Sequence, residues 1–172
     1  LLGGDYYVDY ADDNAPDGKV VRLGDIIAYH NETTVNWLGA FLQGKYDTEK
    51  INLYGMGGIS TIGYTYEDHF ALHVDEDGNT IDNFVEAPST TTFQVKGGAR
   101  YNLDDRLSTF VNAGYVQKPP ILDNVIDYDG NVSTNPDNEK FISNEIGGEY
   151  RSELVAIKGS YYNTQWKDRN LT

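Results

Sequence analysis

The chain has 172 residues, a formal net charge of −14 and no cysteine, which excludes a disulfide framework and thiolate chemistry. The negative charge also disfavours a nucleic-acid partner, because phosphate contacts need a basic surface. No apolar run approaches the ~20 residues of a transmembrane helix, so any membrane span must consist of strands. The 14 Tyr and 18 Gly residues favour a curved all-β sheet with aromatic borders over a helical fold.

Long polar segments alternate with strand-like segments along the chain. Segment 1–33 is expected to be a long loop, in which Asp17-Gly18 indicates a hairpin turn. Six segments alternate apolar and polar residues and are predicted strands: 34–46, 51–66, 92–102, 107–117, 141–151 and 154–166. Two further long loops are expected at 67–89 and 118–140, and the other connections are short turns. The three long loops hold 19 of the 27 acidic residues, so the negative charge belongs to them.

The second predicted strand changes its alternation near its end. Ile62 and Tyr64 fall on the face opposite to Ile51 and Leu53. A β-bulge shifts the two faces by one residue, so the pattern predicts a bulge late in 51–66.

The clearest alternation lies in 92–102 and 107–117. Pairing Tyr101 with Leu107 also pairs Phe93 with Tyr115 and keeps each face consistent. One face is then apolar with aromatic residues at both limits. The aromatic ends are eight residues apart, roughly 20 Å of height in a tilted strand, which is close to the lipid-facing band of an outer-membrane barrel.

Charged residues within the predicted strands all fall on the other face. These mid-strand charges are Lys45, Lys96, Arg100, Glu145, Glu149 and Lys158. A charge near the bilayer midplane costs about 2–4 kcal/mol, so a barrel excludes charges from its lipid face. A soluble sandwich also excludes charges from its core face, so this pattern alone leaves both architectures open.

The connections separate the two architectures. Short turns alternate strictly with long loops, as in bacterial outer-membrane barrels, and a tyrosine precedes each short turn: Tyr46, Tyr101 and Tyr150. These features favour an antiparallel transmembrane β-barrel. Because six strands cannot close and open edges are not tolerated in lipid, we expect a section of a larger barrel.

Three stretches resemble the TonB-dependent outer-membrane receptors, in the expected order and on the expected strands. They are 112–121 (NAGYVQKPPI), 135–147 (NPDNEKFISNEIG) and 161–169 (YYNTQWKDR). The resemblance implies a 22-stranded barrel in the outer membrane of a Gram-negative bacterium, with long extracellular loops and an N-terminal plug. Such a receptor binds a scarce nutrient of the metal-chelate, cobalamin or glycan class and imports it with energy from the TonB complex.

The plug and the TonB-contacting segment are not found in these residues, so we expect a middle-to-late part of the barrel and contact with TonB through a segment outside it. Outer-membrane lipid is the other expected partner. Two alternatives are a passive porin-like protein and a soluble or surface-displayed β-sandwich that binds a ligand. The sequence has no Gly-x-Ser-x-Gly, Walker loop or cysteine pair, so no enzyme and no cofactor are predicted.

Candidate ligand-binding residues lie in the first loop. Tyr6, Tyr7 and Tyr10 are aromatic side chains that can stack on a sugar or macrocycle in an extracellular vestibule, although tyrosines also pack loops. No metal site is predicted. His69 and His73 are four residues apart, about 13 Å in an extended chain, which is too far to share an ion.

An acidic group with the spacing of calcium ligands also lies in the second loop: Asp75, Asp77, Asn79 and Glu86. Thr80 occupies the position at which a calcium loop needs glycine for its sharp turn. A hairpin turn at Asp77-Gly78 explains these residues at least as well.

Overall fold

The computed structural model describes residues 6–7, 20–21, 30–74, 80–127, 130–133 and 136–169. The main sheet contains seven antiparallel strands: β3 (Asn31–Asp47), β4 (Ile51–Val74), β5 (Thr80–Glu86), β6 (Thr90–Asn102), β7 (Leu107–Lys118), β8 (Glu139–Arg151) and β9 (Ala156–Lys167). Their order is β3-β4-β6-β7-β8-β9, and β5 pairs with the far end of β4. The predicted all-β antiparallel class is therefore confirmed.

Three small elements lie outside the main sheet. The short strands β1 (Tyr6–Tyr7) and β2 (Val20–Val21) pair antiparallel with each other, and the 3-10 helix η1 (Leu122–Asn124) follows β7. Within the described part of the chain, no helix is both long and apolar enough to span a membrane.

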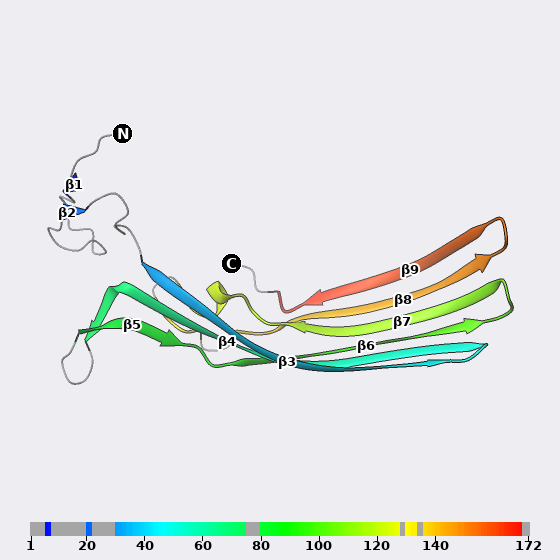
Figure 1. Ribbon diagram of the computed structural model, residues 1–172, viewed down its shortest axis with the longest axis horizontal. Helices are drawn as coiled ribbons and strands as arrows, with labels where there is room; N and C mark the ends of the chain where they lie inside the picture. The colour runs from blue at the N-terminus through cyan, green and yellow to red at the C-terminus, as the bar shows by residue number, and fades with distance from the viewer. Residues whose placement is uncertain are drawn as a thin grey trace.

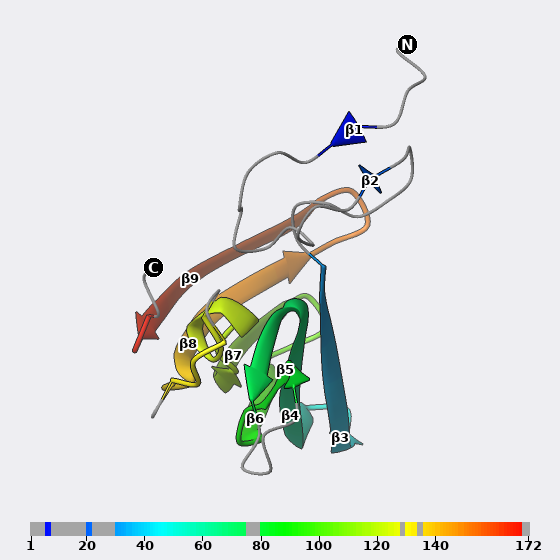
Figure 2. The same cartoon turned by 90° about the vertical axis from the view of Figure 1, so that its left-hand side faces the viewer.

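The sheet is long, curved and open. The three short turns lie together at one end, while η1 and the β4–β5 extension lie at the other (Figure 1). Seen from the end with η1 and β5, the strands from β3 to β9 follow a curved line (Figure 2). The sheet is not closed, since β3 and β9 are its two edges.

All six predicted strands are present, and the main difference lies in the predicted loop 67–89. There β4 continues to Val74 and forms a hairpin with β5, so this part of the chain is largely strand. The acidic composition of 67–89 resembles that of a loop, which is why a loop was predicted there. The pairing of β4 with β5 overrides this local preference.

The cross-strand register gives the sheet two chemically distinct faces. One row runs from Lys45 through Tyr54, Gly98 and Asn112 to Glu145. Successive residues alternate between faces, so all six mid-strand charges share the face of this row, called here the polar face. The opposite face, called the apolar face, carries large hydrophobic residues on each strand of the row: Leu42, Leu53, Val95, Val111, Ile146 and Tyr161.

The register of the β6–β7 hairpin differs from the prediction by two residues. Tyr101 pairs with Thr109 instead of Leu107, and Val95 instead of Phe93 pairs with Tyr115. The turn determines this shift, because the Leu107 carbonyl accepts a hydrogen bond from the Leu103 N–H at 2.9 Å. A shift of two residues leaves each face unchanged, so the facial assignment is correct although the pairing is wrong.

The predicted bulge within 51–66 is absent. Both β3 and β6 pair with this part of β4 in continuous register, and the irregularity lies later, between Asp68 and Leu72, in the pairing with β5. The apolar residues change face for another reason. Tyr64 and Tyr66 pack with Val125 and Ile126, which come from the connection after β7, so the polar face is covered at this end of the sheet.

The corrected register predicts which engineered cysteines form a disulfide. Direct partners in an antiparallel pair have Cα atoms about 4.5–5.5 Å apart, whereas diagonal neighbours are about 7–8 Å apart. We expect Val95→Cys with Tyr115→Cys to oxidise readily, as measured by mass spectrometry of the refolded protein. Phe93→Cys with Tyr115→Cys is the control and should remain reduced; preferential oxidation of this control would restore the pairing predicted from sequence.

The β6–β7 turn predicts a local pH effect. The Asp104 carboxylate accepts hydrogen bonds from the Arg106 N–H at 2.8 Å and from the Leu107 N–H at 2.9 Å. These two bonds, the one from Arg106 first, hold the pKa of the Asp104 carboxyl below its ordinary value of 3.8. A lowered folded-state pKa stabilises the fold above pH 3.8, and this contribution is lost as the pH falls through the folded value.

We therefore expect Asp104→Ala to lower the thermal midpoint at pH 7, measured by circular dichroism, and the difference from wild type to shrink below pH 3.8. Asp105→Ala is the matched control in the same turn and should have little effect. An equal loss in both variants would show that the two backbone hydrogen bonds of Asp104 do not stabilise the turn.

Candidate membrane-facing surface and polar face

The apolar face is uncovered over most of the sheet. Leu38 and Leu42 on β3 are 78% and 81% exposed, and Ile146 on β8 is 59% exposed. In contrast, the buried apolar residues of the described chain form one small cluster at the loop end: Tyr64, Tyr66, Ala87, Val125 and Ile126. Full burial of an aliphatic or aromatic side chain contributes about 1.5–3 kcal/mol, so the exposed face forgoes much of the stabilisation that a core provides.

Aromatic residues border the apolar face at both ends. Three tyrosines lie on this face beside the short turns: Tyr46 on β3, Tyr101 on β6 and Tyr150 on β8. These strands occupy every second position in the sheet. Towards the other end, the rings of Phe93 and Tyr115 stack with centroids 5.2 Å apart. The apolar band is therefore flanked on two sides by aromatic rings, as the sequence predicted.

Hydrogen bonds and ion pairs connect the polar face across several strands. The Tyr54 hydroxyl on β4 donates to Asn112 Oδ1 on β7 at 3.1 Å, and Asn112 Nδ2 donates to Glu145 Oε2 on β8 at 2.8 Å. Gly98 on β6 makes this possible, because a Cβ there would lie 2.2 Å from Asn112 Oδ1 and 2.5 Å from the Tyr54 ring. The network therefore passes over a position that tolerates no side chain.

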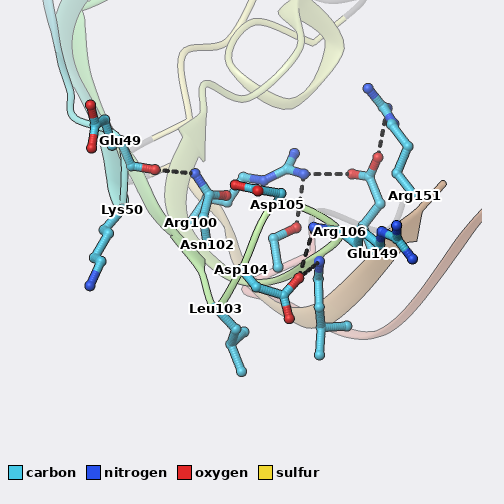
Figure 3. Close-up of a pocket in the computed structure, with 12 residues that line it drawn as sticks. Glu49, Lys50, Arg100, Asn102, Leu103, Asp104, Asp105, Arg106, Glu149 and Arg151 are labelled. Carbon is cyan, nitrogen blue, oxygen red and sulfur yellow. Dashed lines mark hydrogen bonds and ion pairs between the residues drawn. The ribbon is translucent and has the colours of Figure 1, made fainter. Parts of the chain in front are cut away.

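A second polar group lies near the short turns. Glu149 accepts from Arg100 Nη2 at 3.0 Å and from Arg151 Nη2 at 2.6 Å, and Arg100 also donates to Ser108 Oγ at 2.8 Å. These residues line a hollow of about 340 Å³ together with the β6–β7 turn (Figure 3). Only 11% of the Glu149 side chain is exposed, so both of its carboxylate oxygens depend on the arginines for compensation.

An aromatic hollow on the polar face was not recognised from sequence as a site. Trp37 and Phe41 on β3 lie on the same face as Lys45. They line a hollow of about 480 Å³ with Gly39 and Gly58, which contribute no side-chain volume, and Gln94. Recognising it required the β3–β4–β6 register, because its lining residues are far apart in the chain.

The tyrosines predicted to bind ligand are only partly described. The backbone of Tyr6 and Tyr7 forms β1 and pairs with Val21 and Val20. The hairpin turn predicted at Asp17-Gly18 lies outside the described residues. The side chains of Tyr6 and Tyr7 and all of Tyr10 lie outside the described residues. Their role in ligand binding stays a prediction.

The histidines and acids of the second loop are arranged differently from the sequence pattern. His69 lies beside His30, with ring centroids 4.3 Å apart, and this proximity was missed because 30 was assigned to an irregular loop. His73 continues along β4 opposite Ile81, and 75–79 lie outside the described residues, so the calcium-like spacing is not tested. Ser60 on β4 shares a hydrogen bond of 2.8 Å with Thr92.

No protein-family model matches the chain, and no match was found among curated proteins or solved structures.

The Glu149 cluster predicts a stability difference between two Glu→Gln substitutions. Glu149→Gln removes the charge that two arginines share, and hydrogen bonds to charged groups contribute about 1.5–3 kcal/mol each, so we expect a loss of about 1–3 kcal/mol of unfolding free energy. Glu153→Gln, in the exposed β8–β9 turn, is the control and should change it by less than about 0.5 kcal/mol. Urea unfolding followed by tryptophan fluorescence measures both; equal effects would contradict a stabilising role for this cluster.

Proposed function

We propose that the chain is a section of the transmembrane β-barrel of a TonB-dependent outer-membrane transporter, which binds a scarce nutrient and imports it with energy from the TonB complex. The observation that carries the proposal is the exposed apolar face, bounded by aromatic residues, on a sheet whose six mid-strand charges all lie on the other face. Lipid is the medium that such a face requires.

The edges of the sheet support a larger assembly in the membrane. Strands β3 and β9 are exposed along their whole length, and neither has a partner on its outer side within the described residues. Unpaired backbone groups cost several kcal/mol each in hydrocarbon, so both edges need further strands. We infer that these strands complete the barrel.

The polar face supports a water-filled interior. The interior of an outer-membrane barrel is polar, and this face combines charged pairs, hydrogen-bonded amides and hydroxyls with open hollows. The aromatic hollow around Trp37 and Phe41 provides a surface on which a flat or ring-shaped nutrient can stack. Metal chelates, cobalamin and glycans are the nutrient classes expected for this family.

The two alternative functions make different demands. A soluble β-sandwich needs a second layer over the apolar face, and none of the described residues provides one. A passive porin shares the barrel but lacks a plug domain. A protein that is soluble without detergent would therefore favour the β-sandwich over the transporter. A plug domain in the parent polypeptide would favour the transporter over the porin.

Membrane fractionation and gel mobility of the intact parent polypeptide test the proposal. We expect a large outer-membrane protein whose gel mobility changes on boiling, because a folded barrel remains folded in SDS at room temperature and unfolds only on heating. A soluble product with no change in mobility would exclude the barrel. A heat-sensitive outer-membrane barrel without a plug would favour the porin.

The facial assignment predicts opposite outcomes for two Val→Arg substitutions. Val95 lies on the apolar face, and Val116 pairs with Gln94 on the polar face, so the two valines differ by only one register position in height. Val95→Arg places a charge on the proposed lipid face and is expected to reduce assembly, whereas Val116→Arg is tolerated. The measurement is the heat-shifted fraction in outer membranes; equal assembly of both variants would remove the lipid-face assignment.

A further inference from the structure

The ends of β3 and β4 bring together two histidines that are distant in sequence. His30 directly precedes β3, and its carbonyl accepts a hydrogen bond from the His69 N–H at 2.9 Å, which continues the β3–β4 ladder. Asn31 pairs with Asp68, so the two histidines face each other across the strands. Their ring centroids are 4.3 Å apart with an interplanar angle of 41°.

Two glutamates flank this histidine pair on the same face. Glu32 pairs with Glu67 in the ladder, and each is two residues from one of the histidines. Side chains two residues apart in a strand lie on one face, so all four groups converge. Ligand atoms of His30, Glu32 and His69 lie within 4.8 Å of one another, and Glu67 Oε1 lies 4.0 Å from His69 Nδ1.

We propose that His30, Glu32 and His69 bind a divalent transition-metal ion of the class represented by Zn²⁺. Around a tetrahedral zinc ion with bonds of about 2.0–2.1 Å, neighbouring ligand atoms are about 3.4 Å apart, so small side-chain rotations bring these three atoms into coordination. Three protein ligands leave one position for water or another ligand.

The chemistry of the ligands selects the metal. Imidazole nitrogen favours zinc, copper and nickel, whereas calcium and magnesium prefer oxygen ligands only. Glu67 supplies an additional negative charge beside His69. Segment 67–89 contains seven acidic and no basic residues, which raises the local concentration of cations.

The location of the site points to a bridge between strands. His30 is eight residues from Leu38, the first large residue of the apolar band on β3, which is roughly 27 Å along an extended strand. A metal ion there joins β3 to the extended part of β4, beyond the proposed lipid band. This inference does not depend on the proposed transport function.

Zn²⁺ titration calorimetry on the intact protein in detergent micelles tests the proposal. We expect one Zn²⁺ ion per chain, with no measurable binding to His30→Ala or His69→Ala. Mutation of a group that only hydrogen-bonds to a metal ligand changes metal affinity about 10–100-fold, so Glu32→Gln, which removes a carboxylate ligand, should weaken Zn²⁺ binding by at least about tenfold. His73→Ala is the matched control, because it removes the only other histidine of the chain, and it should bind as wild type does.

Several outcomes would overturn the site. Binding unaffected by His69→Ala, a loss in His73→Ala equal to that in His69→Ala, absence of Zn²⁺ binding, or Ca²⁺ binding in place of Zn²⁺ would each contradict it. Electron paramagnetic resonance of Cu²⁺-loaded wild-type protein keeps the proposal testable if a variant fails to fold. Two nitrogen ligands are expected, and a spectrum with none or one would refute the proposed ligand set.

Discussion

Continuous hydrogen-bonded register from β3 to β9 is the constraint on which the rest of the structure depends. Each strand alone has only a two-residue alternation, which a slip of one position would invert. The ladders fix these alternations relative to one another, so Leu42, Val95 and Ile146 share a face although they lie on separate strands. The same ladders place every mid-strand charge on the opposite face. The two chemically distinct faces thus follow from backbone pairing.

The two faces achieve stability in different ways. The polar face is held by specific cross-strand contacts, such as those from Asn112 to Glu145 and from Arg100 to Glu149. The apolar face has no partner layer among the described residues and buries little of its surface within them. The buried cluster around Tyr64 and Val125 lies at the loop end, where the chain forms its own cover. This division matches the proposed barrel, with lipid outside, water inside and packed loops at one end.

Alternation and turn chemistry were sufficient to predict the strands and their faces, but not the features that depend on particular hydrogen bonds. The two-residue shift of the β6–β7 register follows from the turn closed by Leu103 and Leu107. The β5 strand was not predicted, because it lies in an acidic segment whose composition is typical of a loop. The contact of His30 with His69 required the β3–β4 register, because no local pattern links residues so far apart. Tyr10, predicted as a ligand-binding residue, lies outside the described chain.

The proposed barrel places lipid against the apolar face and water against the polar face. The chain has no cysteine, so a spin label can be attached to a single introduced cysteine. Val95→Cys places the label on the apolar face, and Lys96→Cys places it at the neighbouring position on the polar face. In bilayers, relaxation of the Val95 label should respond to oxygen, which concentrates in lipid, and that of the Lys96 label to a water-soluble nickel complex. Equal access of the nickel complex to both labels would contradict the membrane assignment.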